Sequence, residues 1–246
     1  ITCGVPPYLT GRDTSYWQSY LQDEGFLYEP KMILGEMVYA HIHDQQYLWE
    51  SNVSQLNVYF MESSLPNHII DSTLAIANYW LPYSGIVFVK AADKCSADIR
   101  VSFKSGIGYF SRLGRDAKTD QTCNTTMGLA DLHKEKPDTF RRVVLHEFGH
   151  ALGLLHELQH PDNPIQWDTL EATRHFMAVQ KMSKSQIYQQ IFVKINTATP
   201  GTYDSNSIMV YAVPAKITKN KIEIPWPNKL SEIDKREIKV AYNRPL

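Results

Sequence analysis

The sequence predicts an α+β fold, with a twisted mixed sheet and two helices in an upper lobe and a mainly irregular and helical lower lobe. Strand-like and helix-like patterns follow one another between residues 49 and 158, whereas loop signals and capping patterns dominate residues 159–246. Of the 246 residues, 43% are hydrophobic and 21% are charged, which is the composition of an ordinary globular protein with a sizeable core. Residues 1–48 resemble neither part and form a separate N-terminal segment.

Four segments have the alternating or apolar character of strands, and we expect them to belong to one sheet. They are Leu56–Phe60, Ile86–Ala91, Ala97–Phe103 and Thr126–Leu132. The last segment is short, and we expect it at an exposed edge. Between the first two segments, a proline opens a helix over residues 66–80 that carries a broad apolar stripe.

Capping residues predict where the other helices begin. After a loop marked by Gly106 and Gly108, Asp138 is expected to cap a helix that starts near Thr139. Residues 167–179 are also expected to be helical. Two capping-box pairs predict a helix running to Ile195 and a last helix running through Tyr242; these pairs are Ser183 with Gln186 and Ser231 with Asp234.

The N-terminal segment of residues 1–48 is rich in turn signals. A short helix is expected to follow Asp13 and to end at Gly25, and residues 37–42 read as a strand. His41 and His43 would lie on the same face of that strand, where two side chains could bind one metal ion. No carboxylate or cysteine cluster accompanies them, so we favour solvent-facing histidines over a second metal site.

The strongest pattern in the chain is HEFGHALGLLHE, which spans residues 146–157. His146 and His150 are four residues apart, so on a helix both imidazoles leave one face. A left-handed backbone at Gly153 would end the helix and turn the chain so that His156 returns as a third ligand. Three neutral imidazoles leave one position of tetrahedral Zn²⁺ open, as in catalytic zinc sites. Glu147 can reach the same cavity as a general base.

The alternative to a zinc site is an amphipathic core helix with hydrogen-bonded histidines, which leaves the spacing of these residue types unexplained.

The charge composition and the hydropathy of the chain limit the kinds of binding partner that we expect. The net charge is −1, from 25 basic and 26 acidic residues, so nothing points to nucleic acid or to an anionic membrane. No apolar run reaches the length of a membrane span.

The cysteines and the N-x-S/T tripeptides (sequons) indicate in which cellular compartment the protein is expected. Cys95 and Cys123 lie just after one predicted strand and just before another, and a disulfide between them would be worth about 3–4 kcal/mol. Cys3 is then left over, as a free thiol or as an alternative partner of either cysteine. Asn52 and Asn124 begin N-x-S/T tripeptides and are candidate glycosylation sites. The chain does not begin with methionine, so we expect a removed signal peptide and a secreted protein.

The zinc stretch and Ser207–Tyr211 resemble the astacin family of the metzincin clan of metalloproteases. That family reads H-E-x-x-H-x-x-G-x-x-H-E, followed by a Met-turn of the form S-x-M-x-Y. Val210 departs from the histidine usual in animal members. The resemblance covers residues 49–246 and implies a zincin/metzincin fold, with a catalytic subdomain over 49–158 and a C-terminal subdomain over 159–246.

The resemblance also implies a role for each matching residue. The three histidines would bind one Zn²⁺, and Glu147 would be the general base. Met209 would form an apolar floor beneath the ligands, and Tyr211 would be a switchable fifth ligand that stabilises the oxyanion. Glu157 would meet the new amino terminus that activation creates. An ordinary core methionine and a packing aromatic are the alternatives for Met209 and Tyr211.

Cys3 begins the sequence C-G-V-P, which resembles the cysteine switch of matrix metalloprotease prosegments. A thiolate is a good zinc ligand and would occupy the position of the catalytic water. Thr2 and Pro7 depart from that motif, which has arginine and aspartate there. If the switch operates, the chain is a latent zymogen and residues 1–48 are an inhibitory prosegment.

These patterns together predict a secreted, monomeric zinc endopeptidase that cleaves protein or peptide substrates bound in extended form along residues 126–129. Two alternatives stay open. One is a catalytically silent metzincin fold that serves as a binding or adhesion module. The other is a matrixin, which Glu157 and the S-I-M-V-Y sequence disfavour.

Overall fold

The computed structural model describes residues 45–119, 122–195 and 202–242. A five-stranded sheet has the order β2-β1-β3-β5-β4. Strands β2, β1, β3 and β5 run parallel, and β4 runs antiparallel to β5, so the predicted mixed sheet is confirmed. The strands are β1 (Gln55–Phe60), β2 (Val87–Lys90), β3 (Ile99–Ser102), β4 (Tyr109–Ser111) and β5 (Met127–Leu129).

Helices account for much of the remaining described chain. The longer ones are α2 (Asn67–Ala77), α4 (Pro137–Ala151), α5 (Thr169–Val179) and α7 (Glu232–Ala241). Short helical segments are η1 (Gln45–Tyr47), η2 (Asn78–Trp80), α3 (Leu81–Ser84), η3 (Gly114–Lys118), η4 (Leu132–Lys134), η5 (Glu157–Gln159), α6 (Lys184–Ile187), η6 (Tyr188–Phe192) and η7 (Ala215–Ile217). Within the described residues, no helix has the length and apolar character needed to cross a bilayer.

The edge of the sheet differs from the prediction. Strand β5 is internal, with β3 on one side and β4 on the other, and its three residues are buried. Strand β4, where a loop was expected, lies at that edge of the sheet instead. Gly106 and Gly108 have φ values of +79° and +89° and reverse the chain ahead of β4. Gly128 leaves room for the ring of Phe110, which a Cβ atom there would meet.

The helix that was predicted over residues 66–80 is confirmed as α2 and continues further than expected. It passes through η2 and α3 and ends at Gly85, whose φ is +68°. The prediction that Asp138 caps α4 is wrong. Pro137 takes the first helical position, which suits its fixed φ, so Lys136 occupies the cap position and makes no side-chain cap. Asp138 therefore falls inside the first turn.

Both predicted capping boxes are present. Ser183 and Gln186 cap α6, and Ser231 and Asp234 cap α7. The α6 segment continues as the π-helical turn η6 and ends at Phe192, three residues short of the expected end. Helix α5 begins after Asp168, whose side chain accepts a hydrogen bond from the Glu171 N–H.

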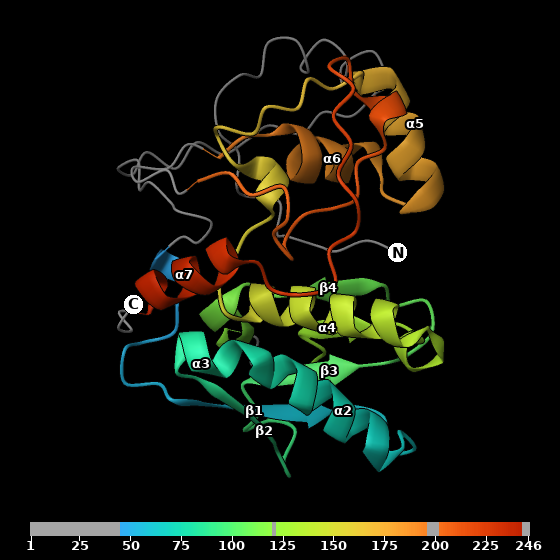
Figure 1. Cartoon of the computed structure of the whole chain (residues 1–246). Coiled ribbons are helices and arrows are strands. Elements are labelled where there is room, and N and C mark those ends of the chain that lie inside the picture. The colour runs from blue at the N-terminus through green and yellow to red at the C-terminus, as the bar shows by residue number, and fades with distance from the viewer. Residues whose placement is uncertain (1–44, 120–121, 196–201, 243–246) are drawn as a thin grey trace.

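Two hydrophobic clusters form most of the core. The first joins the sheet, α2 and α4, and it also takes in Met209 and residues of α7. The second gathers α5, α6 and the chain around Val213. Figure 1 shows α2 and most of the sheet on one side of α4, and α5 and α6 on the other. Helix α4 therefore carries its side chains to the junction of the two clusters.

The predicted disulfide joins Cys95 to Cys123, with Cα atoms 5.0 Å apart. It uses both cysteines, so Cys3 pairs with neither of them. The buried Arg100 reinforces the same region by donating hydrogen bonds to the carbonyl oxygens of Asn124 and Ala117. The connection between β3 and β5 is thus held covalently and by charge-assisted hydrogen bonds.

Candidate metal centre

The end of α4 sets the position of the third histidine. Gly153 has a φ of +91°. Its N–H donates to the His150 carbonyl at 2.8 Å, and the Leu154 N–H donates to the Gly149 carbonyl at 3.0 Å. This pair of bonds is a Schellman motif, which requires a left-handed residue and satisfies the last carbonyls of the helix. The predicted turn at Gly153 is therefore confirmed.

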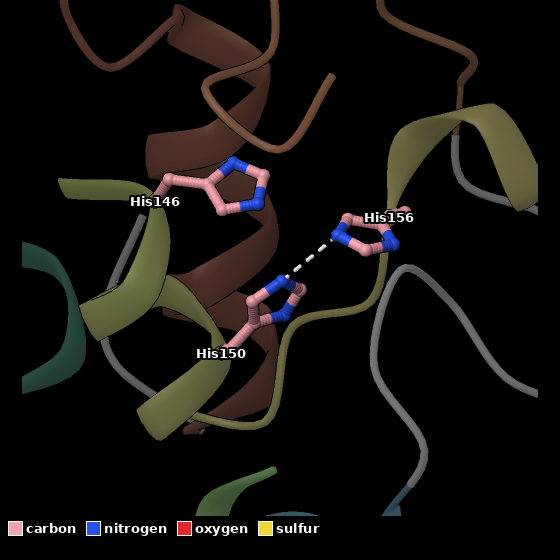
Figure 2. Close-up of side chains that lie close together, drawn as sticks. All are labelled: His146, His150 and His156. Atoms are coloured by element: carbon pink, nitrogen blue, oxygen red, sulfur yellow. Dashed lines mark hydrogen bonds between the residues drawn. The ribbon is translucent and has the colours of Figure 1, made fainter. Parts of the chain in front are cut away.

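The three histidines converge after this turn. His146 and His150 come from α4 and His156 from the segment that follows, and all three are buried. Their candidate ligand atoms lie within 4.8 Å of one another. The Nε2 atoms of His150 and His156 are 3.0 Å apart. Figure 2 shows the three rings turned towards one centre.

The geometry and chemistry of these rings fit a zinc ion. Tetrahedral Zn–N bonds of about 2.0–2.1 Å place ligand nitrogens roughly 3.3 Å apart, and the Nε2 atoms of His150 and His156 are 3.0 Å apart. His146 Nδ1–H donates to the Ile208 carbonyl at 2.8 Å, and His150 Nδ1–H donates to the Leu154 carbonyl at 2.7 Å. These bonds fix the tautomer in which Nε2 carries the free lone pair.

The protonation state of the histidines also suits a metal. Burial lowers the pKa of His146 and His156 well below the usual value, and it lowers the pKa of His150 to about 4. Neutral imidazole is the form that coordinates zinc. Three imidazoles supply three of the four positions of a tetrahedral zinc ion, so His146, His150 and His156 form a zinc-binding group.

Glu147 and Tyr211 both lie at this centre. Glu147 is buried beside His146 on α4, and its charge acts on the neighbouring Arg142 and Tyr109. The ring of Tyr211 is 4.8 Å from the ring of His156 and 5.9 Å from that of His146. Tyr211 is thus in ring contact with two of the three histidines, and Glu147 is buried next to the first of them in the chain.

The Met-turn packs against α4 and against the segment that carries the third histidine. Met209 is fully buried, and a Cβ atom at Gly149 would come 2.5 Å from its sulfur. This glycine, which the sequence analysis did not single out, allows the methionine to approach the helix. The Met209 carbonyl accepts a hydrogen bond from the Glu157 N–H at 3.1 Å. The turn is therefore attached to the segment that carries the third ligand.

Asp234 of α7 holds the same turn from the other side. Its carboxylate accepts hydrogen bonds from Ser207 Oγ at 2.6 Å and from the Ile208 N–H at 2.9 Å. It also accepts one from the Ser231 N–H, as the capping box requires. Burial raises the pKa of Asp234, although these hydrogen bonds oppose the shift. The sequence indicated only the capping role of this residue.

Glu157, which directly follows the third histidine, belongs to a buried polar group with Asp204 and Tyr203. Its Oε1 accepts a hydrogen bond of 2.6 Å from the Asp204 N–H. Glu157 Oε2, Asp204 Oδ2 and the Tyr203 hydroxyl are buried and have no hydrogen-bond partner among the described residues. Burial raises the pKa of Glu157 well above its usual value. Buried polar atoms of this kind are costly unless a partner satisfies them.

The remaining predicted residues are distributed as follows. Asn52 and Asn124 are exposed, and the hydroxyl of Thr126 in the second sequon is buried and accepts a hydrogen bond from the Arg100 N–H. Cys3, His41 and His43 lie outside the described residues.

The sequence analysis also missed residues at the site. Arg142 precedes His146 by one turn of α4, which is a signal in the sequence. Trp226 comes from a distant segment and left no such signal.

The fold and the site together define a metzincin, an α+β protein whose zinc is bound by imidazoles from one helix and the turn after it. The model of the astacin family of peptidases matches residues 41–243. The chain therefore belongs to the astacin family, as the resemblance predicted.

Individual relatives agree with this assignment. The zinc metalloproteinase nas-36 of Caenorhabditis elegans is 29% identical over 104 residues, which are 42% of this chain and 15% of that protein. The sequence of myroilysin, a protein of known structure, is 29% identical to that of this chain. The two structures agree with a TM-score of 0.74, over 82% of this chain and 98% of the myroilysin chain. A hatching enzyme zinc-protease from Oryzias latipes shares the fold at 20% identity and a TM-score of 0.55, over 82% and 96% of the two chains.

We predict that Gly153→Ala lowers the free energy of unfolding by about 2–3 kcal/mol, because it combines a left-handed alanine with crowding against Leu48 and Tyr47. Gly106→Ala is the matched control, since Gly106 also has a positive φ but nothing lies within 4 Å of a Cβ there. It should cost only about 1 kcal/mol. Urea denaturation with and without zinc measures both values. Equal losses in the two variants would contradict the close approach.

Proposed function

We propose that the protein is a zinc endopeptidase that hydrolyses peptide bonds in protein or peptide substrates. The observation that carries this proposal is the three-histidine zinc group, with Tyr211 in ring contact with His146 and His156 and with Glu147 buried next to His146 on α4. Membership of a peptidase family supports it. The matched stretch is only 15% of the C. elegans relative, so the activity is argued from the site of this chain.

The residues divide the chemistry between them. Zinc, when bound, polarises the scissile carbonyl and acidifies the attacking water. Glu147 takes a proton from that water and returns it to the leaving amine, which contributes roughly 10²–10⁴ in rate. The Tyr211 hydroxyl donates a hydrogen bond to the carbonyl oxygen, where negative charge develops only in the transition state. His146 and His150 are kept in the correct tautomer by their bonds to backbone carbonyls.

The substrate is proposed to bind in extended form along β4. Residues 126–129 were expected to receive it, but β5 is paired on both sides and offers no edge. Strand β4 packs against α4 and lies at the edge of the sheet. An extended peptide can add to such an edge through main-chain hydrogen bonds. This arrangement suits an endopeptidase.

Glu157 is proposed to receive a new amino terminus after cleavage in the N-terminal segment. The support is the group of Glu157 Oε2, Asp204 Oδ2 and the Tyr203 hydroxyl, which are buried without described partners. An ammonium group would satisfy all three atoms and offset the cost of burying the carboxylates.

The protein is further proposed to be secreted, glycosylated at Asn52 and Asn124, monomeric and made as a zymogen with Cys3 on the zinc. The Cys95–Cys123 disulfide supports an oxidising compartment, and the asparagines of the two sequons are exposed, as glycosylation requires. The division into a prosegment over residues 1–48 and subdomains over 49–158 and 159–246 is part of this proposal.

The competing function is a catalytically silent metzincin fold that acts as a binding module. The intact Glu147 and Tyr211 favour the enzyme. Casein hydrolysis with and without a chelator distinguishes the two. Hydrolysis that disappears with the chelator and returns with added zinc is expected, and its absence in the processed protein would support the silent module.

We predict that Glu147→Ala retains stoichiometric zinc and loses at least about a hundredfold in peptide hydrolysis, because the base is removed and the ligands are not. Metal analysis and kcat measure the two properties. Glu171→Ala, which removes an exposed carboxylate of α5, is the control and should keep full activity. Full activity in Glu147→Ala would exclude the base.

Replacing Tyr211 by phenylalanine should lower kcat on the order of tenfold or more while KM changes little, because the hydroxyl acts on the transition state. The ring contacts with His156 and Phe176 remain in this variant. Steady-state kinetics separate the two constants, and Tyr83→Phe, away from the site, is the control. An unchanged kcat would remove Tyr211 from the mechanism.

If Cys3 blocks the zinc, the Cys3→Ala variant should hydrolyse casein without prior cleavage, whereas the parent chain requires it. Activity is compared before and after limited proteolysis, with mass spectrometry to establish that the variant is uncleaved. A variant as inactive as the parent before proteolysis would show that the switch idea is wrong.

A further inference from the structure

The C-terminal end of α4 has two backbone carbonyl groups that the Schellman motif leaves without a donor. The motif satisfies the carbonyls of residues 148–150. The carbonyls of Ala151 and Leu152 accept no backbone N–H from the described residues. Both residues are buried, with 1% and 0% of their surface exposed, so water does not replace the missing donors. Because buried carbonyl groups without a donor are destabilising, this end of the helix requires donors from elsewhere in the fold.

Two buried side chains from distant parts of the chain supply these donors. Trp49 Nε1–H donates to the Ala151 carbonyl at 2.8 Å. The Tyr242 hydroxyl, whose pKa burial raises so that it keeps its proton, donates to the Leu152 carbonyl at 2.9 Å. The backbone N–H of Trp49 also donates to the Tyr242 hydroxyl oxygen at 3.4 Å. Trp49 and Tyr242 therefore form one connected group at the end of α4.

The segment of residues 45–49, blue in Figure 1, packs closely against the turn that follows α4. A Cβ atom at Gly153 would lie 3.1 Å from Leu48 Cδ2. A Cβ atom at Gly114 would overlap with the carbonyl oxygen of Tyr47, so a side chain there would displace the segment. Trp49 is thus held by the packing of its neighbours as well as by its hydrogen bonds, as a residue that orients another element must be.

The turn that these donors hold determines the placement of two zinc ligands. The Leu154 carbonyl accepts a hydrogen bond of 2.7 Å from His150 Nδ1–H, which fixes the tautomer and the orientation of that ring. His156 follows two residues later and supplies the third ligand. The carbonyls that Trp49 and Tyr242 bind belong to residues 151 and 152, directly before this part of the chain. A displacement of the turn would therefore move the carbonyl that orients one imidazole and also the next imidazole itself.

We propose that Trp49 and Tyr242 are positioning residues of the zinc centre, which hold the turn after α4 and thereby set the geometry of its second and third ligands. The inference goes beyond the proposed peptidase function, because it concerns the binding of zinc and is tested without a substrate. Groups that orient metal ligands typically account for about 10–100-fold in metal affinity. Loss of either donor should therefore weaken zinc binding.

The alternative is that the two donors stabilise the fold and have no effect on the ligands. The two roles predict different results for zinc binding. A loss of global stability alone does not change the zinc affinity of molecules that remain folded, because affinity then depends on the native site only. A positioning role lowers the affinity of the folded protein itself. The free energy of unfolding and the zinc affinity, measured on the same variant, therefore separate the two roles.

The test uses the full chain with one donor removed at a time. Tyr242→Phe removes the hydroxyl and keeps the ring, and Trp49→Phe removes the indole N–H and keeps an aromatic side chain. Zinc affinity is measured by competition with a chromogenic chelator, and each variant should bind zinc on the order of tenfold more weakly than the parent. Circular dichroism and urea denaturation establish that each variant is folded. Tyr242→Phe, the smaller change, decides the proposal where Trp49→Phe does not fold.

Ser84→Ala is the matched control. Ser84 is fully buried, and its hydroxyl donates to the Trp80 carbonyl at 3.0 Å in a different helical segment, which ends at Gly85. The variant thus also removes a buried hydroxyl that donates to a backbone carbonyl, and it should lower the free energy of unfolding. Its zinc affinity should stay within about twofold of the parent, because this hydroxyl does not act on the turn after α4.

A second readout reports on one ligand directly. In the zinc-loaded protein, nuclear magnetic resonance follows the exchange of the His150 Nδ1–H proton with solvent. This proton is bonded to the Leu154 carbonyl, so its exchange should be faster in Tyr242→Phe than in the parent or in Ser84→Ala. Exchange at the parent rate would remove the role of Tyr242 in orienting His150.

Zinc affinity decides the inference as a whole. An affinity within about twofold of the parent in both donor variants would overturn it, and so would an equal loss of affinity in Ser84→Ala. Absence of any hydrolysis in the parent would instead overturn the proposed function. The zinc measurements would still decide the role of Trp49 and Tyr242, because they need no substrate.

Discussion

The metal centre depends on the left-handed turn at Gly153, where α4 ends. Two hydrogen bonds close the helix there and direct the chain so that His156 returns to the face that carries the other two histidines. Residues from another part of the chain also pack against this turn, because Tyr47 and Leu48 lie next to Gly153. The position of the third ligand is therefore set by backbone geometry and by the residues just before the sheet.

Hydrogen bonds connect the zinc ligands to the Met-turn. His146 binds the Ile208 carbonyl, and the Glu157 N–H binds the Met209 carbonyl, so the Met-turn is joined to both ends of the ligand set. Such contacts orient the metal ligands and fix their tautomers. A change in the packing of the Met-turn would be transmitted to the imidazoles through these bonds.

The sequence predicted what depends on local spacing, which includes the histidines of α4, the turn at Gly153 and the capping boxes. It failed where tertiary contacts decide. Strand β4 has three residues, too few for a period to be recognised, so β5 was expected at the edge. Trp226 reaches the site from a segment far along the chain, and only the fold brings it to Arg142. Asp138 was expected as the cap of α4, but Pro137 takes the first helical position and so places Asp138 inside the helix.

Asp234 connects α7 to the Met-turn, since one carboxylate caps α7 and accepts hydrogen bonds from both Ser207 and Ile208. During synthesis, a nascent polypeptide that extends only to residue 230 has the three histidines and the Met-turn but lacks the acceptor that orders that turn. Assembly of the centre is therefore completed late, after translation has passed α7. Because the Met-turn depends on Asp234, the metal site reaches its final structure only when nearly all of the described chain has been synthesised.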